Sequence, residues 1–393
     1  MKSDVNGRIK KSSTDRSHSL LWLGPLLSVV VAWLALEFGG LTAPASMTLG
    51  VAIWTALWWI FETVPIPVAS LIPLALLPML GILSPQTVGE KYGHPLVLLL
   101  LGGFLLSKAM EKSGAHKRIA VAMVRACPKG DKFLILGFMG TTAFLSMWIS
   151  NTATTLMMLP MALAVIQGTQ NKKLTIPLLL GIAFAANVGG IGTPIGTPPN
   201  LVMMAAYKDL GFQELSFSDW MRFGLPVTLV MTLVIWLWLA RSVSGKDSIS
   251  LPHSGNWKKA EVRTLCVFCL TALAWITRSE PFGGWKTWLD LPEANDASVA
   301  FIAVIFLFCF PNGEKKGERL LDWKTANQIP WGMLILVGAG LCLGEGFKQS
   351  GLSESIASAL SGVENLPALG VLVGICLLVT FLTEVTSNTA TTN

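Results

Sequence analysis

Two identical strings of small polar residues lie inside long uncharged stretches of the 393-residue chain. Ser150–Thr155 reads Ser-Asn-Thr-Ala-Thr-Thr, and the same string returns as Ser387–Thr392, 237 positions later. Hydroxyl and amide oxygens can coordinate a hard cation without formal charge, while amide N–H and hydroxyl groups can donate hydrogen bonds to a carboxylate. Polar groups are costly to bury in apolar surroundings, so we take the two strings as the candidate binding site.

Residues upstream of the two strings repeat with the same offset. Gly103 is matched by Gly340, Ser113-Gly114 by Ser350-Gly351, and Ile119-Ala120 by Ile356-Ala357. The offset stays at 237 positions, without gaps, from Gly103 to the first string, which indicates an internal duplication. The elements that position the two strings are therefore expected to be two copies of one structural unit.

The composition indicates the surroundings of these strings. Hydrophobic residues make up 52% of the chain and charged residues 13%, against about 25% charged residues in ordinary domains. Membrane spans need about 20 apolar residues. Matching uncharged stretches occur at Leu20–Leu36, Leu41–Phe61, Thr63–Gly89, Leu174–Tyr207, Phe223–Ala240 and Thr325–Leu343, with shorter ones at Pro95–Ser107, Thr264–Thr277 and Ala297–Asn312. We predict an all-α polytopic membrane protein, with the lipid bilayer as its surroundings.

The net charge of +6 is explained by the distribution of the basic residues. If the N-terminal tail 1–19 is cytoplasmic and the chain alternates, most of the 29 basic residues fall into cytoplasmic loops. This is the positive-inside pattern of membrane proteins rather than a patch for a polyanion. We predict a multi-pass protein of the inner (plasma) membrane with a cytoplasmic N-terminus and no nucleic-acid partner.

Phe133–Asn171 contains the first string in 39 residues without a charge. Two full spans need about 40 residues and a turn besides. The basic residues Lys132 and Lys172 place both ends of the segment on the cytoplasmic side. A re-entrant helical hairpin with Ser150–Thr155 near its tip satisfies both the length and the topology.

Leu174–Tyr207 is interrupted by Gly189–Asn200, which holds four glycines and three prolines in twelve residues. Such a string cannot form one continuous helix. We predict a broken helix, whose free N–H and C=O groups can bind ions as in transporters. The string lacks the GxGxxG spacing and the Lys-Ser/Thr pair of nucleotide-binding loops.

The two copies of the duplicated unit are expected to have opposite orientations, because we count five crossings between them. The crossings lie at 95–110, at 174–207, and three times between 223 and 312. With an odd number of crossings between them, the two copies start on opposite sides of the membrane, which defines an inverted-topology repeat. The second hairpin then enters from outside, starting after Glu364 with its tip near Ser387–Thr392. Because the first copy continues beyond its string, we expect the chain to be truncated after Asn393.

At these residues the chain resembles the divalent anion/sodium symporter family of INDY-type dicarboxylate transporters. The matching features are the paired strings, Trp58-Trp59 with Glu62 and Pro65, and Gly196–Asn200. The resemblance covers 20–393. It implies a homodimer of elevator-type transporters, each with a scaffold domain, a transport domain, and one dicarboxylate site flanked by two Na⁺ sites.

The resemblance also implies the domain organisation and the site residues. The expected parts are a cytoplasmic tail (1–19), a first scaffold part with surface helices (20–132), a first transport part of inner hairpin, broken helix and following span (133–242), a second scaffold part (243–364), and a truncated outer hairpin (365–393). The Na⁺ ligands would be Ser146, Ser150, Asn151 and Gly196 in one site and Thr383, Thr386 and Asn388 in the other. Asn151, Thr152, Thr197, Ser387, Asn388 and Thr389 would face the substrate. The family's second glycine-proline loop is absent from this chain.

The function that these features imply is sodium-coupled symport of a C4-dicarboxylate such as succinate, malate or fumarate. The alternatives are transport of citrate, sulfate or another divalent anion, exchange instead of symport, and a non-transporting fragment. No nucleophile–base or metal pair is visible at membrane depth, so we predict no enzymatic activity and no organic cofactor beside Na⁺. The only deep acid near a string is Glu384, and its role, like that of Glu62 and the Na⁺ stoichiometry, stays open.

Overall fold

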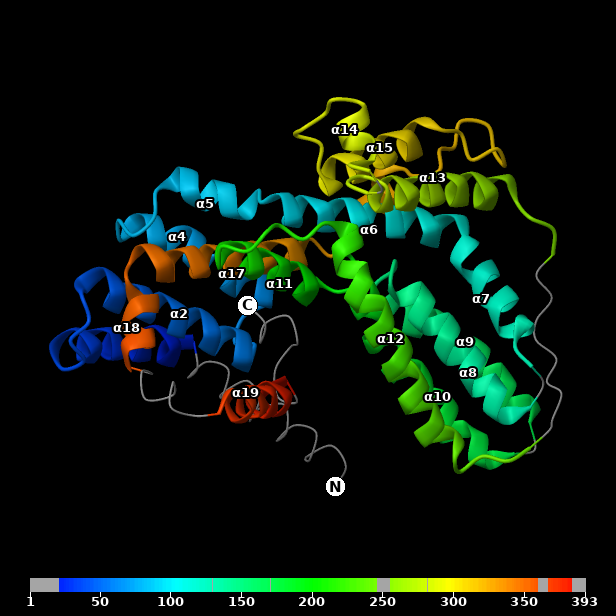
Figure 1. Ribbon diagram of the computed structural model, residues 1–393, viewed down its shortest axis with the longest axis horizontal. Coiled ribbons are helices and arrows are strands. Elements are labelled where there is room, and N and C mark those ends of the chain that lie inside the picture. The colour runs from blue at the N-terminus through cyan, green and yellow to red at the C-terminus, as the bar shows by residue number, and fades with distance from the viewer. Residues whose placement is uncertain are drawn as a thin grey trace, which may run out of the picture. The chain divides into compact units, whose positions relative to one another are not determined.

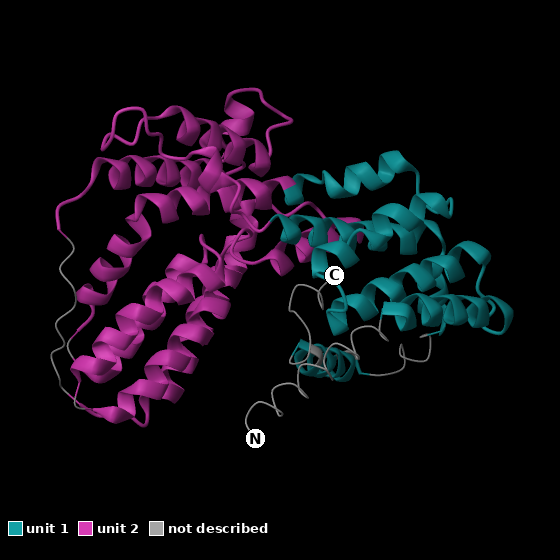
Figure 2. Cartoon of the chain, turned by 180° about the vertical axis from the view of Figure 1, so that it is seen from behind, with its two compact units in different colours: residues 1–97, 331–393 teal, residues 98–330 magenta. Residues whose placement is uncertain are grey.

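The computed structural model describes residues 21–128, 130–169, 171–245, 255–280, 282–359 and 367–383. Within these ranges the regular structure is helical, apart from one isolated β-bridge between Pro311 and Arg319. The helices fall into two compact units, drawn in two colours in Figure 2. Unit 1 comprises Met1–Val97 and Trp331–Asn393, and unit 2 comprises Leu98–Pro330. The all-α fold predicted from the sequence is confirmed.

Unit 1 holds the helices from both ends of the chain, most of which are labelled in Figure 1. They are the N-terminal helix Leu21–Glu37, α2 (Ala43–Phe61), α3 (Ile66–Ala69), α4 (Ile72–Met79), α5 (Pro85–Tyr92), α17 (Trp331–Gln349), α18 (Leu352–Ala359) and α19 (Ala368–Thr383). Helix α17 packs against α2, α3, α4 and α5. The core includes Trp59, Leu77 and Leu336, and the Lys91 ammonium lies 2.9 Å from a Glu345 carboxylate oxygen.

Unit 2 holds the middle of the chain, and α6 (Pro95–Ser113) runs across the boundary at Val97. Its other elements are α7 (Ala115–Ala126), α8 (Asp131–Ser146), α9 (Asn151–Gly168), η1 (Lys172–Leu174), α10 (Thr175–Gly189), η2 (Gly190–Gly192), α11 (Pro198–Asp209), α12 (Phe217–Ala240), α13 (Lys259–Ile276), α14 (Gly284–Trp288), α15 (Asp296–Cys309) and α16 (Trp323–Ala326). Helix α10 packs on α8, α9 and α12, and α8 also packs on α9 and α12.

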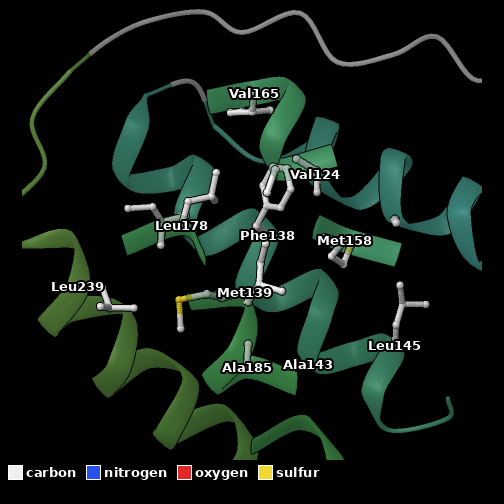
Figure 3. Close-up of a cluster of buried hydrophobic side chains, with 14 of the residues drawn as sticks. Val124, Phe138, Met139, Ala143, Leu145, Met158, Val165, Leu178, Ala185 and Leu239 are labelled. Atoms are coloured by element: carbon white, nitrogen blue, oxygen red, sulfur yellow. The ribbon is translucent and has the colours of Figure 1, made fainter. Parts of the chain in front are cut away.

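The core of unit 2 lies between these helices, as Figure 3 shows. Phe138 and Met139 of α8, Met158 of α9 and Leu178 of α10 are fully buried. Burying a side chain of this size contributes about 1.5–3 kcal/mol. This apolar contact holds the two arms of the hairpin against the first arm of the broken helix.

The prediction of one span over Thr63–Gly89 is wrong. Helix α2 ends at Phe61, and its C-cap residue Glu62 has a left-handed φ of 45°. The segment beyond it forms α3, α4 and the start of α5. Prolines 65, 67, 73, 78 and 85 fall in this stretch. Each lacks a backbone N–H, and each disfavours helix in the residue before it. The segment therefore folds as short helices.

In the described part of the chain, five helical segments are long and apolar enough to cross a membrane. They are Ala43–Phe61, Pro85–Ser113, Lys172–Gly192, Phe217–Ala240 and Trp331–Gln349. The predicted span Thr325–Leu343 is displaced, because α16 ends at Ala326 and α17 starts after Pro330. A proline disfavours helix in the residue before it, which separates the two helices. The polytopic class predicted from the sequence is confirmed.

The duplication seen in the sequence is also present in the helix bounds. Helix α8 (Asp131–Ser146) and helix α19 (Ala368–Thr383) both have 16 residues and start 237 positions apart. Helices α6 and α7 correspond to α17 and α18 in the same order. Helix α19, the expected first arm of the second hairpin, begins at Ala368, and the second hairpin itself stays a prediction. The inverted orientation of the two copies stays a prediction.

Candidate functional site

The first string forms the turn and the first residues of the second arm of a helical hairpin. Helix α8 ends at Ser146, four residues follow, and α9 starts at Asn151. The Ser150 hydroxyl accepts a hydrogen bond from the backbone N–H of Ala153 at 3.3 Å, which makes Ser150 the N-cap of α9. The predicted hairpin with the string at its tip is confirmed, and its re-entrant course in a membrane stays a prediction.

The turn of the hairpin is held by aromatic rings. The Trp148 ring stacks on Phe217, the first residue of α12, with centroids 6.1 Å apart. It also meets Phe268 of α13 edge-on at 5.1 Å. Phe217 in turn stacks on Trp275 at 4.6 Å. Aromatic pairs of this geometry contribute about 0.5–1.5 kcal/mol beyond the area that they bury.

The predicted broken helix is confirmed and lies beside the hairpin. Helix α10 ends at Gly189, and α11 starts at Pro198. The Asn200 side-chain amide donates to the carbonyls of Gly190 at 2.7 Å and Thr193 at 2.8 Å. The Thr193 hydroxyl donates to the carbonyl of Met147 in the hairpin turn. Carbonyls that the helix break frees are thus paired with side chains.

Three oxygens meet where the hairpin touches the end of α10. The Ser146 hydroxyl oxygen lies 2.6 Å from Asn151 Oδ1 and 2.7 Å from the backbone carbonyl oxygen of Ala186. A hydroxyl has a single hydrogen, so it can donate to only one of these oxygens at a time. Uncharged hydroxyl, amide and backbone oxygens gathered in this way are ligands of the kind that a small hard cation prefers.

Two glycines bring the broken helix within contact of Asn151. A Cβ added to Gly190 would lie 3.0 Å from Asn151 Oδ1 and 3.3 Å from Thr197 Cβ. A Cβ added to Gly196 would lie 2.4 Å from the Gly190 carbonyl oxygen. The approach at Gly196 leaves no room for a side chain, and the approach at Gly190 leaves little. They bring Asn151, Thr197 and the Gly196 turn to one place.

The helix ends around Asn151 provide partial charges of both signs. The C-terminus of α10, at Gly189, carries the negative end of a helix dipole, which favours a cation. The N-termini of α9 at Asn151 and of α11 at Pro198 carry positive ends, which favour an anion. The site can therefore hold a cation beside an anion with uncharged side chains.

The structure brings together most of the predicted residues of the first site. Asn151, Gly196 and Thr197 gather around Gly190, and Ser146 contacts Asn151. Thr152 is exposed in the first turn of α9. Ser150 lies next to them, with its hydroxyl oxygen engaged in capping.

The residues predicted for the second site lie at the end of the chain. Thr383 is the last residue of α19, and its hydroxyl donates to the carbonyl of Thr380 at 2.8 Å. Thr386, Ser387, Asn388, Thr389 and Glu384 lie outside the described residues. The second Na⁺ site and its share of the substrate contacts stay predictions.

Several residues of the site were not selected from the sequence. Asn187 is exposed at the end of α10, with its Oδ1 3.4 Å from the Asn151 amide nitrogen. Asn200 and Thr193 hold the freed carbonyls, and the Ala186 backbone completes the oxygen cluster. Asn200 stood in the string that carried the resemblance. The Ala186 carbonyl could not be selected from the sequence, because every residue carries a backbone carbonyl.

Comparison with known proteins places this arrangement in a family. The family model described as citrate transporter matches residues 56–393. The sodium-dependent dicarboxylate transporter SdcS of Staphylococcus saprophyticus is 36% identical over 394 residues, which cover 94% of this chain and 75% of that protein. A protein of the same name from a strain of Staphylococcus aureus is 36% identical over 405 residues, with 97% and 77% covered.

A helical membrane protein in which a hairpin tip and a broken helix meet around uncharged oxygens has the design of a secondary transporter. The match to the family model and the 36% identity over nearly the whole chain identify the family within this class of transporters. The chain belongs to the citrate transporter family. This confirms the resemblance to the divalent anion/sodium symporters that the sequence motifs indicated.

Proposed function

We propose that the protein couples the movement of Na⁺ to the uptake of C4-dicarboxylates such as succinate, malate and fumarate across the inner (plasma) membrane. The observation that carries the proposal is the cluster of Ser146 Oγ, Asn151 Oδ1 and the Ala186 carbonyl oxygen at the negative end of α10. Relatives named sodium-dependent dicarboxylate transporters, which span nearly the whole chain, support both the ion and the substrate class. They also favour transport over enzymatic activity.

In this proposal Na⁺ binds first, at the three oxygens around Ser146. The anion then binds beside it, accepting hydrogen bonds from the Asn151 amide and from the hydroxyls of Thr152 and Thr197 at the N-termini of α9 and α11. None of these groups carries a formal charge, so the dicarboxylate depends on bound Na⁺ to offset its charge. Neither ion is stable at membrane depth alone, which is the physical reason for coupling.

The remaining parts of the proposal concern the second half of the site and the motion. Thr383, Thr386 and Asn388 would bind a second Na⁺, and Ser387, Asn388 and Thr389 would complete the substrate contacts. The transport part would move across the membrane against the scaffold part in a homodimer, as an elevator. The duplicated helices α8 and α19, of equal length, support two equivalent hairpins.

Uptake into proteoliposomes tests the function. With the purified protein reconstituted, we expect an inward Na⁺ gradient to drive accumulation of labelled succinate, and an equal K⁺ gradient to leave uptake at the level of protein-free vesicles. Unlabelled fumarate and malate should compete at lower concentrations than citrate or sulfate. Stronger competition by citrate would shift the substrate to tricarboxylates, and equal uptake in K⁺ would contradict sodium coupling.

Cysteine labelling tests the inverted repeat. In a cysteine-free background, a single cysteine at Gly168, next to the basic segment Lys172-Lys173, should react with a membrane-impermeant maleimide only from the cytoplasm. A single cysteine at Gly362, which lies outside the described residues between Glu354 and Glu364, should react only from outside. Reaction of both from one side would rule out the inverted repeat.

A further inference from the structure

One face of helix α12 contacts the broken helix at the residues that adjoin the oxygen cluster. Trp220, Gly224 and Thr228 are spaced by four residues, so they lie on the same face. Trp220 is 2% exposed and Thr228 is 3% exposed. A buried polar side chain in an apolar span is costly unless it is paired. Both side chains are paired, and both partners belong to the broken helix.

The contacts go to backbone carbonyls at the end of α10 and in η2. The Thr228 hydroxyl donates to the Val188 carbonyl at 3.0 Å. The Trp220 indole N–H donates to the Ile191 carbonyl at 2.8 Å. A Cβ on Gly224 would lie 2.6 Å from the Ile191 carbonyl oxygen. Glycine at this position therefore lets the two backbones come close enough for both hydrogen bonds.

The segment held in this way is the one that the site uses. Val188 lies two residues after Ala186, whose carbonyl oxygen faces Ser146. Ile191 follows Gly190, which is in contact with Asn151. At the end of α10 the Gly190 N–H reaches the carbonyls of both Ala186 and Val188, and the last carbonyls of a helix otherwise lack helical donors. Helix α12 adds one side-chain donor to the Val188 carbonyl and another to the Ile191 carbonyl.

We propose that Trp220, Gly224 and Thr228 are positioning residues of the Na⁺ site. They direct the Val188 and Ile191 carbonyls toward α12 and so keep the Ala186 carbonyl aimed at Ser146 and Asn151. A binding site has to be held within about 0.5 Å of its productive geometry by the groups around it. The inference rests on the proposed function, because it takes Na⁺ as the ion that the oxygen cluster binds.

Thr228→Val tests the role of the hydroxyl at constant size. Without the hydroxyl, the Val188 carbonyl keeps only the Gly190 backbone N–H, and the hydrogen bond that fixes the end of α10 to α12 is lost. We expect the Na⁺ concentration for half-saturation to rise about 5- to 10-fold, the size of effect that loss of one buried hydrogen bond produces. Uptake at saturating Na⁺ should be retained, because the substrate contacts of Thr152 and Thr197 are unchanged. Thr228→Ser, which restores the hydroxyl, should restore Na⁺ affinity.

Thr232→Val is the matched control. Thr232 lies one turn further along the same face of α12, is 6% exposed, and lines the same cavity between α8 and α12 as Thr228. Its buried hydroxyl has no hydrogen-bond partner among the described residues. Thr232→Val replaces the same hydroxyl with a methyl group but removes no hydrogen bond to the broken helix. We expect Na⁺ affinity within about twofold of the parent.

Equilibrium binding of radioactive sodium to the purified protein is the measurement, with uptake as a second readout. Trp220→Phe provides an independent variant that loses the Ile191 hydrogen bond and keeps a ring, and it decides the question if Thr228→Val does not fold. Parent-like Na⁺ affinity in the folded Thr228→Val or Trp220→Phe protein would overturn the inference, as would an equal loss in Thr232→Val. Absence of Na⁺ binding by the parent would overturn the proposed function and this inference with it.

Discussion

Asn151→Ala is expected to abolish Na⁺-dependent succinate uptake while leaving the amount of folded protein unchanged. Its Oδ1 lies 2.6 Å from the Ser146 hydroxyl oxygen in the oxygen cluster, and its amide nitrogen faces the Asn187 side chain. Loss of a polar partner from a buried site costs about 1–3 kcal/mol, which is roughly 5- to 150-fold in binding. In the proposed function Asn151 serves both the ion and the anion, so the two losses multiply.

Initial rates of labelled succinate uptake in proteoliposomes, at matched protein content, measure this loss. Thr155→Val is the control within the same string. The Thr155 hydroxyl donates to the Asn151 backbone carbonyl at 2.8 Å within α9, so its removal leaves the Asn151 side chain in place. Uptake by Asn151→Ala within about twofold of the parent, well short of the expected loss, would remove Asn151 from the site.

Gly196→Ala is expected to reduce uptake by at least about tenfold, because the added methyl group has no room. The new Cβ would lie 2.4 Å from the Gly190 carbonyl oxygen and 3.0 Å from its Cα. Both are backbone atoms, which cannot rotate away as the end of a side chain can. Gly190 or the Gly196 turn has to move, and either movement displaces Asn151 and Thr197.

Gly140→Ala is the matched control for this substitution. Gly140 lies within α8 of the hairpin, and a Cβ there would have no neighbour within 4 Å. Alanine in a helix interior is favoured over glycine by about 0.5–1 kcal/mol, so this protein should be at least as stable as the parent. Uptake by Gly196→Ala at the level of Gly140→Ala would contradict the close approach as a requirement of the site.

Much of the architecture could be predicted from local features of the chain. The hairpin followed from the 39 uncharged residues between basic ends, and the helix break followed from glycines and prolines that no continuous helix tolerates. The duplication followed from the constant offset, and α8 and α19 have equal length at that offset. These are properties of short segments, so composition and spacing suffice to find them.

The bounds of some spans could not be predicted in the same way. From hydropathy alone, Thr63–Gly89 was predicted as one span, and another span was predicted to start at Thr325. The structure has several short helices in the first case and starts α17 after Pro330 in the second. Both segments are apolar, as their composition indicated. The error arose because prolines act on backbone geometry, to which a count of apolar residues is insensitive.

The partners of the site depended on contacts between segments distant in sequence. Ser146 and Asn151 were found from the string, but the oxygen that completes their cluster is the backbone carbonyl of Ala186. Thr228 of α12 meets the Val188 carbonyl, 40 positions away in the chain. Every residue carries the same carbonyl group, so sequence cannot show which ones are turned toward a site. That depends on where α10 breaks and on which helices pack around the break.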